Sequence, residues 1–447
     1  MHRRDMLRLA VSSAASLNLL ALGSRAAQKS GVVRIWVDWE RSHGQTTPFT
    51  FGSNDYEITI PERAADRVYQ KRLSELGIGL VRVHHAALCD RWTNPVTKTW
   101  DEAKIKAGYS ALYPQRPTII QNISGWTQWM AQNKEGILDV SQYDRYGGFC
   151  AELVKIVTRR LGHRQVIYWE PFNEKEDSYQ RSGKLDELWK IYNKAAKAMK
   201  AVNPQIKVGG PVLKWNDTTK IAAFLKACRE NVDFITWHSY ATGNPNESTH
   251  NLMSRTPDYT NQVRQIRALA KQYIPGKKIP LLLGEYNINY SWDSGENRQN
   301  SHIGAVWFAS VLKHLADAGI DMAASWHLKD GIYGMIDPQN KLRPAANVFS
   351  WGVKYLTGKL MYAESDNPLV EAMAVDRGNK TRSLLLINKS DAVAQLRILA
   401  KQNVTTVSRV PIFYLDSNGV RTSTVTAAML KTKPLILPSY SLALLRL

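Results

Sequence analysis

Residues 165–175 read QVIYWEPFNEK, and this stretch holds both a structural and a chemical signal. The apolar and aromatic run 165–170 has the length and composition of a buried β-strand. Two polar residues, Asn173 and Glu174, come shortly after it, and an amphipathic helical pattern follows at 186–202. A strand that leads into a helix is the repeating unit of parallel α/β sheets, so we expect further copies of this unit.

The strand-helix unit recurs along the first three quarters of the chain. Candidate strands lie at 49–52, 79–84, 117–123, 165–170, 207–211, 233–238, 280–285 and 322–326. Helical patterns lie at 62–76, 142–161, 186–202, 218–230, 260–273 and 300–318, and Gly77 is a helix stop after Leu76. Eight such units within about 300 residues predict a closed (β/α)₈ barrel rather than an open sheet.

The pattern changes after Gly358. Alternating β-rich segments lie at 370–375, 382–387, 394–399, 404–414 and 439–447, separated by turn residues. We therefore predict an α/β chain with a barrel over 31–357 and a C-terminal β-sandwich domain over 358–447. An early strand at 32–36 precedes the barrel and can join the β-domain.

The first residues resemble an export signal. Residues 1–26 begin with a positive segment that contains Arg3 and Arg4, continue with a modest apolar run, and end in small residues near Ala26. The paired arginines resemble a twin-arginine signal. No stretch reaches the roughly 18 apolar residues of a membrane-spanning helix. We expect a periplasmic or secreted protein with no integral membrane span.

The chain is basic, with 59 Lys and Arg against 39 Asp and Glu and a formal net charge of +20. This charge attracts anions such as nucleic acid or acidic polysaccharide. The basic residues are scattered and no nucleic-acid-binding motif accompanies them, so we expect no nucleic-acid partner. The three cysteines, Cys89, Cys150 and Cys228, lack CxxC spacing, which argues against a zinc site. Which pair of them could oxidise stays open.

The predicted strand ends carry polar and aromatic residues that fit carbohydrate chemistry. These residues are Arg82-Val83-His84-His85, Asn173-Glu174, His238-Ser239-Tyr240, Glu285-Tyr286-Asn287 and Trp326-His327. Catalytic groups of such barrels lie at the C-terminal ends of the strands. Glycoside hydrolysis needs two carboxyl groups, and Glu174 and Glu285 would face each other across the barrel mouth. Adjacent histidines on a strand point to opposite faces, so we predict no catalytic metal. We also predict no cofactor, since Gly77-Ile78-Gly79 lacks the third glycine of a dinucleotide-binding motif.

The segment Trp169-Glu170-Pro171-Phe172-Asn173-Glu174 resembles the Trp-Glu-x-x-Asn-Glu segment of retaining clan A glycoside hydrolases, especially family 39. That family includes β-xylosidases, α-L-iduronidases and bacterial exopolysaccharide hydrolases. The run 233–240 resembles its sixth strand, and Glu285-Tyr286-Asn287 resembles its nucleophile strand. The resemblance covers the barrel and extends to the β-domain.

The resemblance implies a role for each matching residue. Glu174 would be the general acid/base, Glu285 the nucleophile, and Asn173 a hydrogen-bond partner of the sugar 2-hydroxyl. Further substrate-binding residues would be His85, His238, Tyr240, Trp326 and Lys175, and the supporting residues would be Arg82 and Asn287. Arg82 could hold Glu285 ionised, or form a buried structural pair with Glu170.

Two features depart from the family pattern. Lys175 stands where many relatives have Pro, and Phe51-Gly52-Ser53-Asn54 replaces a more usual glycine pair at the first strand end. We expect Lys175, and Lys329 after Trp326, to lie in the cleft and to favour an acidic sugar.

The sequence thus predicts an exported retaining glycoside hydrolase, endo-acting on an exopolysaccharide or matrix polymer that can be acidic. An exo-acting β-xylosidase or uronic-acid glycosidase is one alternative. A non-catalytic carbohydrate-binding matrix protein is another, although the presence of both glutamates counts against it.

Overall fold

The computed structural model describes residues 31–110, 116–292, 295–402, 405 and 407–447. Residues 32–447 form one compact unit. The predicted export signal, residues 1–26, lies outside the described residues. In the described ranges, no helix combines the length and the apolar character needed to span a bilayer.

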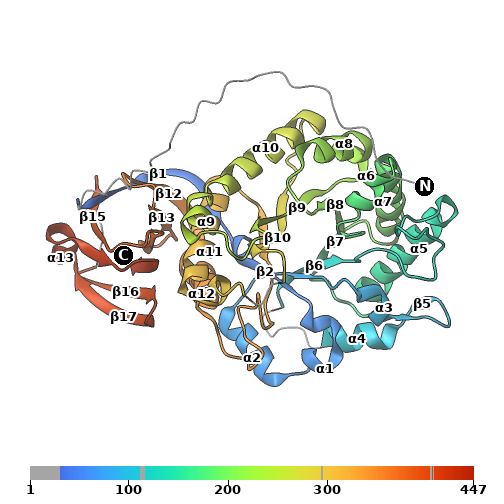
Figure 1. The fold of residues 1–447 in the computed structure, drawn as a ribbon, viewed down its shortest axis with the longest axis horizontal. Helices are drawn as coiled ribbons and strands as arrows, with labels where there is room; N and C mark the ends of the chain where they lie inside the picture. Colours follow the sequence, from blue (N-terminus) through green and yellow to red (C-terminus); the bar gives the residue numbers. More distant parts are fainter. Residues whose placement is uncertain (1–30, 111–115, 293–294, 403–404, 406) are drawn as a thin grey trace, which may run out of the picture. The chain divides into compact units, whose positions relative to one another are not determined.

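Eight parallel strands close into a barrel in the order β10-β11-β2-β3-β6-β7-β8-β9, with helices around it (Figure 1). The strands are β2 (Gly52–Asp55), β3 (Leu80–Val83), β6 (Thr118–Asn122), β7 (Val166–Glu170), β8 (Lys207–Leu213), β9 (Phe234–Thr242), β10 (Leu281–Asn289) and β11 (Met322–Ser325). The predicted (β/α)₈ barrel is therefore confirmed.

The first barrel strand begins later than the sequence predicted. Residues Pro48–Phe51 form a short 3₁₀ helix instead of a strand. The Thr47 hydroxyl accepts a hydrogen bond from the Phe49 N–H, and the Thr50 hydroxyl accepts one from the Thr47 N–H. This reciprocal cap, with Pro48 in the first turn, favours a helical start and delays the strand to Gly52.

Six main helices match the predicted helical patterns. They are α2 (Arg67–Leu76), α5 (Tyr143–Val154), α7 (Leu185–Val202), α8 (Thr218–Cys228), α10 (Asp258–Tyr273) and α11 (His302–Asp317). The predicted helix 62–76 is broken into α1 (Pro61–Ala64) and α2, because the Asp66 carboxylate caps α2 by accepting from the Val68 and Tyr69 N–H groups. Gly77 ends α2 in the left-handed region, with φ of 67°.

Other helical elements were not predicted. An exception is a π-helical turn, Lys155–Arg160, which continues α5 within the predicted pattern 142–161. The remaining helices are α3 (Leu88–Trp92), α4 (Glu102–Ser110), α6 (Glu176–Arg181), α9 (Thr249–Ser254), α12 (Pro344–Tyr355) and α13 (Ala427–Thr432). Several of them are too short to show a helical period in the sequence.

Apolar side chains fill the barrel interior. Leu80, Ile120, Phe234, Leu282 and Met322 form a core cluster of their own, each at most 1% exposed. They come from five different barrel strands, so they form a packed layer across the interior. The cluster makes the barrel a solid support for the side chains at its C-terminal end.

The C-terminal strands form one continuous nine-stranded sheet, in the order β17-β16-β19-β14-β13-β12-β1-β15-β18. The strands are β1 (Val33–Thr46), β12 (Gly358–Ser365), β13 (Val370–Asp376), β14 (Arg382–Asn388), β15 (Ala394–Ala400), β16 (Arg409–Asp416), β17 (Gly419–Thr426), β18 (Leu435–Leu437) and β19 (Ser441–Arg446). The early strand β1 lies inside this sheet, between β12 and β15.

The sheet has an apolar core on each face. Ala372 and Ala374 of β13 belong to a core cluster confined to the β-domain. Met373 and Val375, which alternate with them, belong to the large cluster that includes the barrel helices. Successive residues of a strand face opposite sides, so the sheet packs on the barrel with one face and curls around its own core with the other.

A buried ionic cluster also joins the two parts. The Glu371 carboxylate accepts from Lys389 Nζ at 2.5 Å, from the Ser310 hydroxyl at 2.6 Å, and lies 2.8 Å from His314 Nε2. Burial by itself raises the pKa of Glu371, but the His314 hydrogen bond and the Lys389 charge lower it to about 2. Ser310 and His314 belong to α11, so this charge links the barrel to β13.

The three cysteines are buried and free. Burial raises the pKa of the Cys150 thiol to about 12, so it stays protonated. No pair among Cys89, Cys150 and Cys228 is oxidised in this structure.

Candidate active site

One of the two predicted catalytic glutamates, Glu174, follows the C-terminal end of β7, and the other, Glu285, lies in the middle of β10. Glu174 follows β7 in a turn, with a positive φ of 48°. Its N–H donates to the Val212 carbonyl of β8 at 3.0 Å, which fixes the turn to the neighbouring strand. Glu285 lies within β10 and is only 5% exposed. A barrel strand therefore holds one carboxylate, and a turn that is fixed to a barrel strand holds the other.

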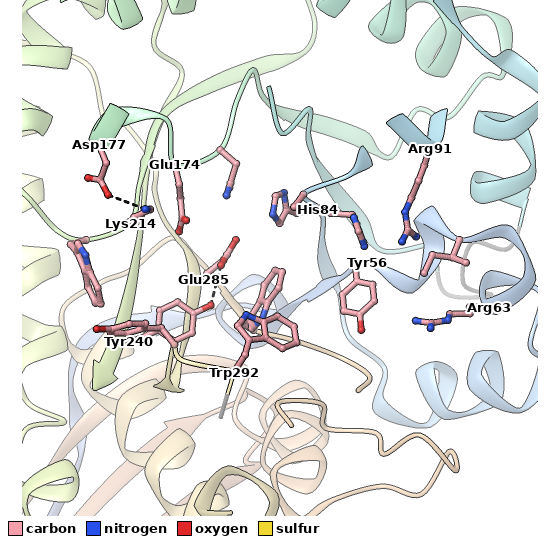
Figure 2. Close-up of a pocket in the computed structure, with 17 residues that line it drawn as sticks. Tyr56, Arg63, His84, Arg91, Glu174, Asp177, Lys214, Tyr240, Glu285 and Trp292 are labelled. Atoms are coloured by element: carbon pink, nitrogen blue, oxygen red, sulfur yellow. Dashed lines mark hydrogen bonds and ion pairs between the residues drawn. The ribbon is translucent and has the colours of Figure 1, made fainter. Parts of the chain in front are cut away.

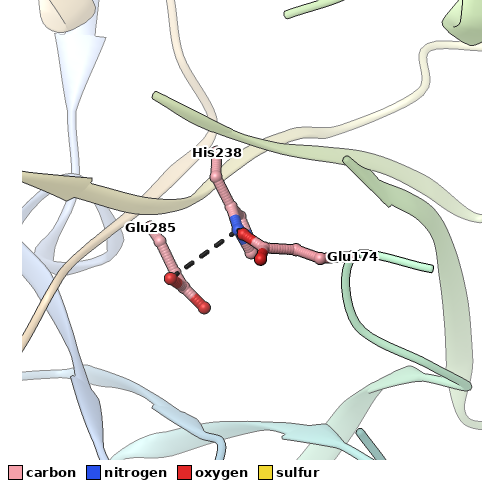
Figure 3. Close-up of side chains that lie close together, drawn as sticks. All are labelled: Glu174, His238 and Glu285. Carbon is pink, nitrogen blue, oxygen red and sulfur yellow. Dashed lines mark hydrogen bonds and ion pairs between the residues drawn. The ribbon is translucent and has the colours of Figure 1, made fainter. Parts of the chain in front are cut away.

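His238 lies between the two carboxylates (Figure 3). Its Nδ1 is 2.6 Å from Glu174 Oε1 and 3.7 Å from Glu285 Oε2. One oxygen of each carboxylate and one nitrogen of the imidazole lie within 4.8 Å of one another. Carboxyl groups about 5–5.5 Å apart suit a direct nucleophilic attack, whereas about 6.5–9.5 Å leaves room for an intervening water.

The guanidinium of Arg82 organises the base of this site. Its Nη1 donates to Glu285 Oε1 at 2.8 Å and to Asn54 Oδ1 at 3.0 Å. Its Nε donates to Glu170 Oε2 at 2.8 Å, and its Nη2 donates to Asn173 Oδ1 at 2.7 Å. Arg82 therefore contacts both of the carboxylates considered for it, Glu285 and Glu170.

Burial raises the pKa of both Glu174 and Glu285. For Glu285, the charge of Arg82 and the Tyr240 hydrogen bond oppose this increase, but they do not outweigh it. Arg82 thus does not depress the pKa of Glu285 below its ordinary value, contrary to our expectation, because desolvation is the larger effect.

The hydrogen bonds distinguish the two carboxyl groups. Glu285 receives direct donors from Arg82 and Tyr240, whereas Glu174 has His238 as its neighbour. Burial lowers the pKa of His238 to about 4, so this imidazole is neutral at pH 7. The negative charge of the pair is therefore best held on Glu285 and the proton on Glu174.

The other predicted site residues lie around this pair. Tyr240 Oη donates to Glu285 Oε2 at 3.0 Å. Asn173 lines the cavity, and its Oδ1 is taken by Arg82, so its amide nitrogen is left to donate to a ligand. Asn287 donates to the carbonyl of Trp326 and supports the end of β11. His238 is fully buried and contacts the carboxylates instead of lining the cavity.

A cavity of about 770 Å³ opens above the two glutamates (Figure 2). Its lining includes Trp326 and both His84 and His85. We expected the two histidines to face opposite sides of a strand. Both line the cavity because β3 ends at Val83, so the strand alternation no longer applies to them.

The expected positions of Lys175 and Lys329 are wrong, since neither lines the cavity. Lys175 Nζ lies 5.4 Å from the ring centroid of Trp126. Lys329 Nζ lies 5.2 Å from the ring centroid of Tyr69 and 3.6 Å from the carboxylate of its ion-pair partner, Asp66. Aromatic faces attract both ammonium groups away from the cleft.

Other side chains take their place in the lining. They are Tyr56, Arg63, Arg91, Asp177, Lys214, Trp215, Tyr290 and Trp292. The last two and Trp215 are exposed aromatic residues, at 49%, 52% and 43%. The chain contains 14 Trp and 19 Tyr against 9 Phe. This composition indicates aromatic contacts with a ligand, but it does not show which residues make them.

Comparison with known proteins agrees with this site. The family model described as glycosyl hydrolases family 39 matches residues 122–342. A β-xylosidase of Geobacillus stearothermophilus is 24% identical over 258 residues, which cover 52% of this chain and 50% of that protein. The match thus spans about half the length of this curated relative.

Solved structures show the same fold. A monomeric β-xylosidase from Caulobacter crescentus CB15 aligns with a TM-score of 0.68 at 16% identity, over 92% of this chain and 99% of that one. A GH39 enzyme from Xanthomonas axonopodis pv. citri aligns with a TM-score of 0.68 at 16% identity, over 95% of this chain and 99% of that one.

In sequence and in the fold of its barrel, the chain is therefore similar to clan A glycoside hydrolases. Within that clan, the family that the sequence matches is glycoside hydrolase family 39. The matched residues, 122–342, include Glu174, Glu285 and Trp326.

Proposed function

We propose that this protein is a retaining glycoside hydrolase that cleaves internal bonds of a polysaccharide, an exopolysaccharide or another matrix polymer. The observation that carries the proposal is the spacing of Glu174 and Glu285, whose nearest ligand oxygens lie within 4.8 Å. Such a gap favours direct attack on the sugar over attack by a water molecule held between the carboxylates.

In the first step, a Glu285 oxygen attacks the anomeric carbon. The electron pair of the breaking glycosidic bond goes to the leaving oxygen, which takes the proton from Glu174. Arg82 and Tyr240 donate to the two Glu285 oxygens and so orient the nucleophile. The amide nitrogen of Asn173 donates to the sugar 2-hydroxyl. The result is a covalent glycosyl-enzyme.

In the second step, Glu174 is a carboxylate and acts as the general base. It takes a proton from an incoming water, whose oxygen attacks the anomeric carbon, and Glu285 leaves with the electron pair of its ester bond. Glu174 ends protonated, ready for the next cycle. Two inversions at the same carbon retain the anomeric configuration.

The extent of the cavity supports cleavage within a polymer. Lys214 and Asp177 lie beside Glu174 on one side, and Tyr56, Arg63 and Arg91 lie beyond His84 on the other (Figure 2). Trp215 and Tyr290, whose ring centroids are 5.3 Å apart, add an aromatic wall to the cavity. Lining on both sides of the catalytic pair suits a substrate that continues past the cleaved bond.

The proposal includes a location and a polymer type. The pattern of residues 1–26 supports export to the periplasm or the outside of the cell. The formal net charge of +20 supports attraction to a matrix that carries acidic sugars.

An exo-acting β-xylosidase or uronic-acid glycosidase is the second candidate, because the matched relative from Geobacillus stearothermophilus is named a β-xylosidase. A non-catalytic carbohydrate-binding protein does not require an oriented nucleophile. The hydrogen bonds that Arg82 and Tyr240 donate to Glu285 therefore favour an enzyme over this alternative.

Incubation with a panel of neutral and uronic-acid polysaccharides, with product length read by mass spectrometry, tests the proposal. A ladder of oligosaccharides is the expected result. Release of monosaccharides alone would replace endo action by exo action. Binding of a polysaccharide without any product would favour the non-catalytic protein.

The chemical mechanism has its own test. A slow 2-fluoro glycoside should label Glu285, and nuclear magnetic resonance should show product of retained configuration immediately after cleavage. An inverted product, or a label on another residue, would overturn the assignment of the two glutamates.

A further inference from the structure

One end of the cavity is lined by cations and hydrogen-bond donors. The described lining residues of segment 56–91 include Arg63, Arg91 and His85, and no carboxylate is among them. Figure 2 shows Arg63 and Arg91 on the far side of His84 from Glu174, both directed toward Tyr56. We call Arg63, Arg91 and His85 the donor cluster.

The two arginines differ in how they are held. Arg63 Nη1 donates to Glu57 Oε1 at 2.8 Å, and the Arg63 side chain is 53% exposed while that of Glu57 is 3% exposed. Glu57 therefore holds Arg63 from behind. Within the described residues, the guanidinium of Arg91 has no hydrogen-bond or ion-pair partner, although it lines the cavity.

His85 contributes a neutral donor. Its Nδ1 accepts the Ala87 N–H at 2.9 Å, so the proton of the neutral ring lies on Nε2. Burial, with the charges of Arg91 and Arg63, lowers the pKa of His85 to about 4. The ring is thus neutral at pH 7 and has no free acceptor atom.

We propose that the donor cluster binds an anionic group, a carboxylate or a sulfate ester, on a sugar at the non-reducing side of the scissile bond. This inference rests on the proposed function, because that function defines the two sides of the cavity. Glu174 protonates the leaving oxygen, so the leaving sugar lies on its side, near Lys214. The donor cluster lies on the opposite side (Figure 2).

The donor cluster fits an anion better than it fits a hydroxyl. Guanidinium groups and an Nε2–H imidazole can only donate, and several donors that converge need an acceptor with several lone pairs. A carboxylate or a sulfate has two or three equivalent oxygens and forms paired, charge-assisted hydrogen bonds with arginine.

Arg63 is paired with Glu57, so the excess of positive charge at the donor cluster is that of Arg91, and the described lining of the opposite end has no such unpaired cation. Lys214 Nζ donates to Asp177 Oδ2 at 2.9 Å, so the ammonium group there is already neutralised. An acidic substituent should therefore favour cleavage only when it lies on the non-reducing side. The same substituent on the leaving sugar should bring no gain.

Matched oligosaccharides test this asymmetry. The substrates are a neutral oligosaccharide, the same compound with a uronate on the non-reducing side, the same with a sulfate ester there, and an isomer with the uronate on the leaving side. For the wild type, kcat/KM should be highest for one of the two compounds with an anion on the non-reducing side. The better of the two shows whether the cluster binds a carboxylate or a sulfate ester.

Variants assign the preference to residues. Arg91→Gln should lower the ratio of kcat/KM for that anionic substrate to kcat/KM for the neutral one by about tenfold or more, as expected for a lost charge-assisted hydrogen bond. Arg91→Lys should retain part of the preference. Arg67→Gln is the matched control, because Arg67 is exposed, lies outside the cavity lining and carries the same charge.

Calorimetry separates this inference from the proposed function. Binding of the anionic oligosaccharide to Glu285→Gln should weaken when Arg91→Gln is added and when salt is raised, even if no substrate is ever cleaved. If binding weakens in this way but the wild type cleaves no substrate, the proposed anion site is supported and the proposed hydrolase activity is overturned. Equal ratios in the wild type, Arg91→Gln and Arg67→Gln overturn the donor cluster and leave the hydrolase intact.

Discussion

Replacing Tyr240 with Phe removes one hydrogen bond from the nucleophile and keeps the aromatic ring. Tyr240 Oη donates to Glu285 Oε2 at 3.0 Å. A hydrogen bond to a charged group contributes about 1.5–3 kcal/mol. At about 1.4 kcal/mol per pK unit, this corresponds to an increase of about one to two units in the pKa of Glu285.

The sign of the effect follows from the charge of the nucleophile. Glu285 must be ionised in order to attack. Activity is therefore lost at low pH, where the Glu174–Glu285 pair takes up a second proton, and this loss is the acidic limb of the plot of kcat/KM against pH. Tyr240 stabilises the ionised form. Tyr240→Phe should therefore move this limb to higher pH by about one to two units and lower activity below the new midpoint.

The assay is kcat/KM on an aryl glycoside, followed between about pH 4 and pH 9. Tyr290→Phe is the control, since Tyr290 also lines the cavity, and Glu285 has no hydrogen bond from it. An acidic limb that stays at the wild-type position in Tyr240→Phe would refute the reasoning, because Tyr240 would then not be donating to an ionised Glu285.

Three further outcomes follow from the structure. Glu174→Ala should slow substrates with good leaving groups less than those with poor ones, and added azide should restore turnover as a glycosyl azide of retained configuration. The Glu371 carboxyl, with its pKa lowered to about 2, should stabilise the fold by on the order of 3 kcal/mol at neutral pH, and this stability should be lost as the pH falls from about 4.5 toward 2. Urea unfolding should show it as a gap between the wild type and Glu371→Gln that closes as the pH falls. Trp292→Ala should raise KM for oligosaccharides more than it lowers kcat, because Trp292 is an exposed wall of the cavity; an unchanged KM would remove it from the binding surface.

The barrel could be predicted because its strands are short apolar runs that end in polar residues. The run before Glu170 and the run before Glu285 both have this form. The first becomes a strand close to the expected bounds, whereas the second continues past Glu285 to Asn289. The first strand failed this test, since Pro48 and the cap at Thr47 turn an apolar run into a 3₁₀ helix. Local capping competes with strand formation in a way that hydrophobicity alone does not reveal.

The catalytic pair could be predicted because each glutamate follows or ends a short apolar run of the sequence. Side-chain direction could not. Lys175 is next to Glu174 in the sequence, but its ammonium group lies over Trp126. Arg63 and Arg91 come from short helices after two different strands, and only the closed barrel brings them to one end of the cavity. Sequence neighbours of a catalytic residue are therefore a poor guide to substrate contacts.

The place of β1 in the nine-stranded sheet has a consequence for how the protein is made. Arg34 at the start of β1 is hydrogen-bonded to Asp366, 332 residues later. On the ribosome, β1 emerges long before β12 and β15, so both of its edges stay unpaired until translation is almost complete. Unpaired strand edges recruit other chains. A shortened gene that ends after the barrel should therefore give an aggregating product unless the codons for β1 are removed as well.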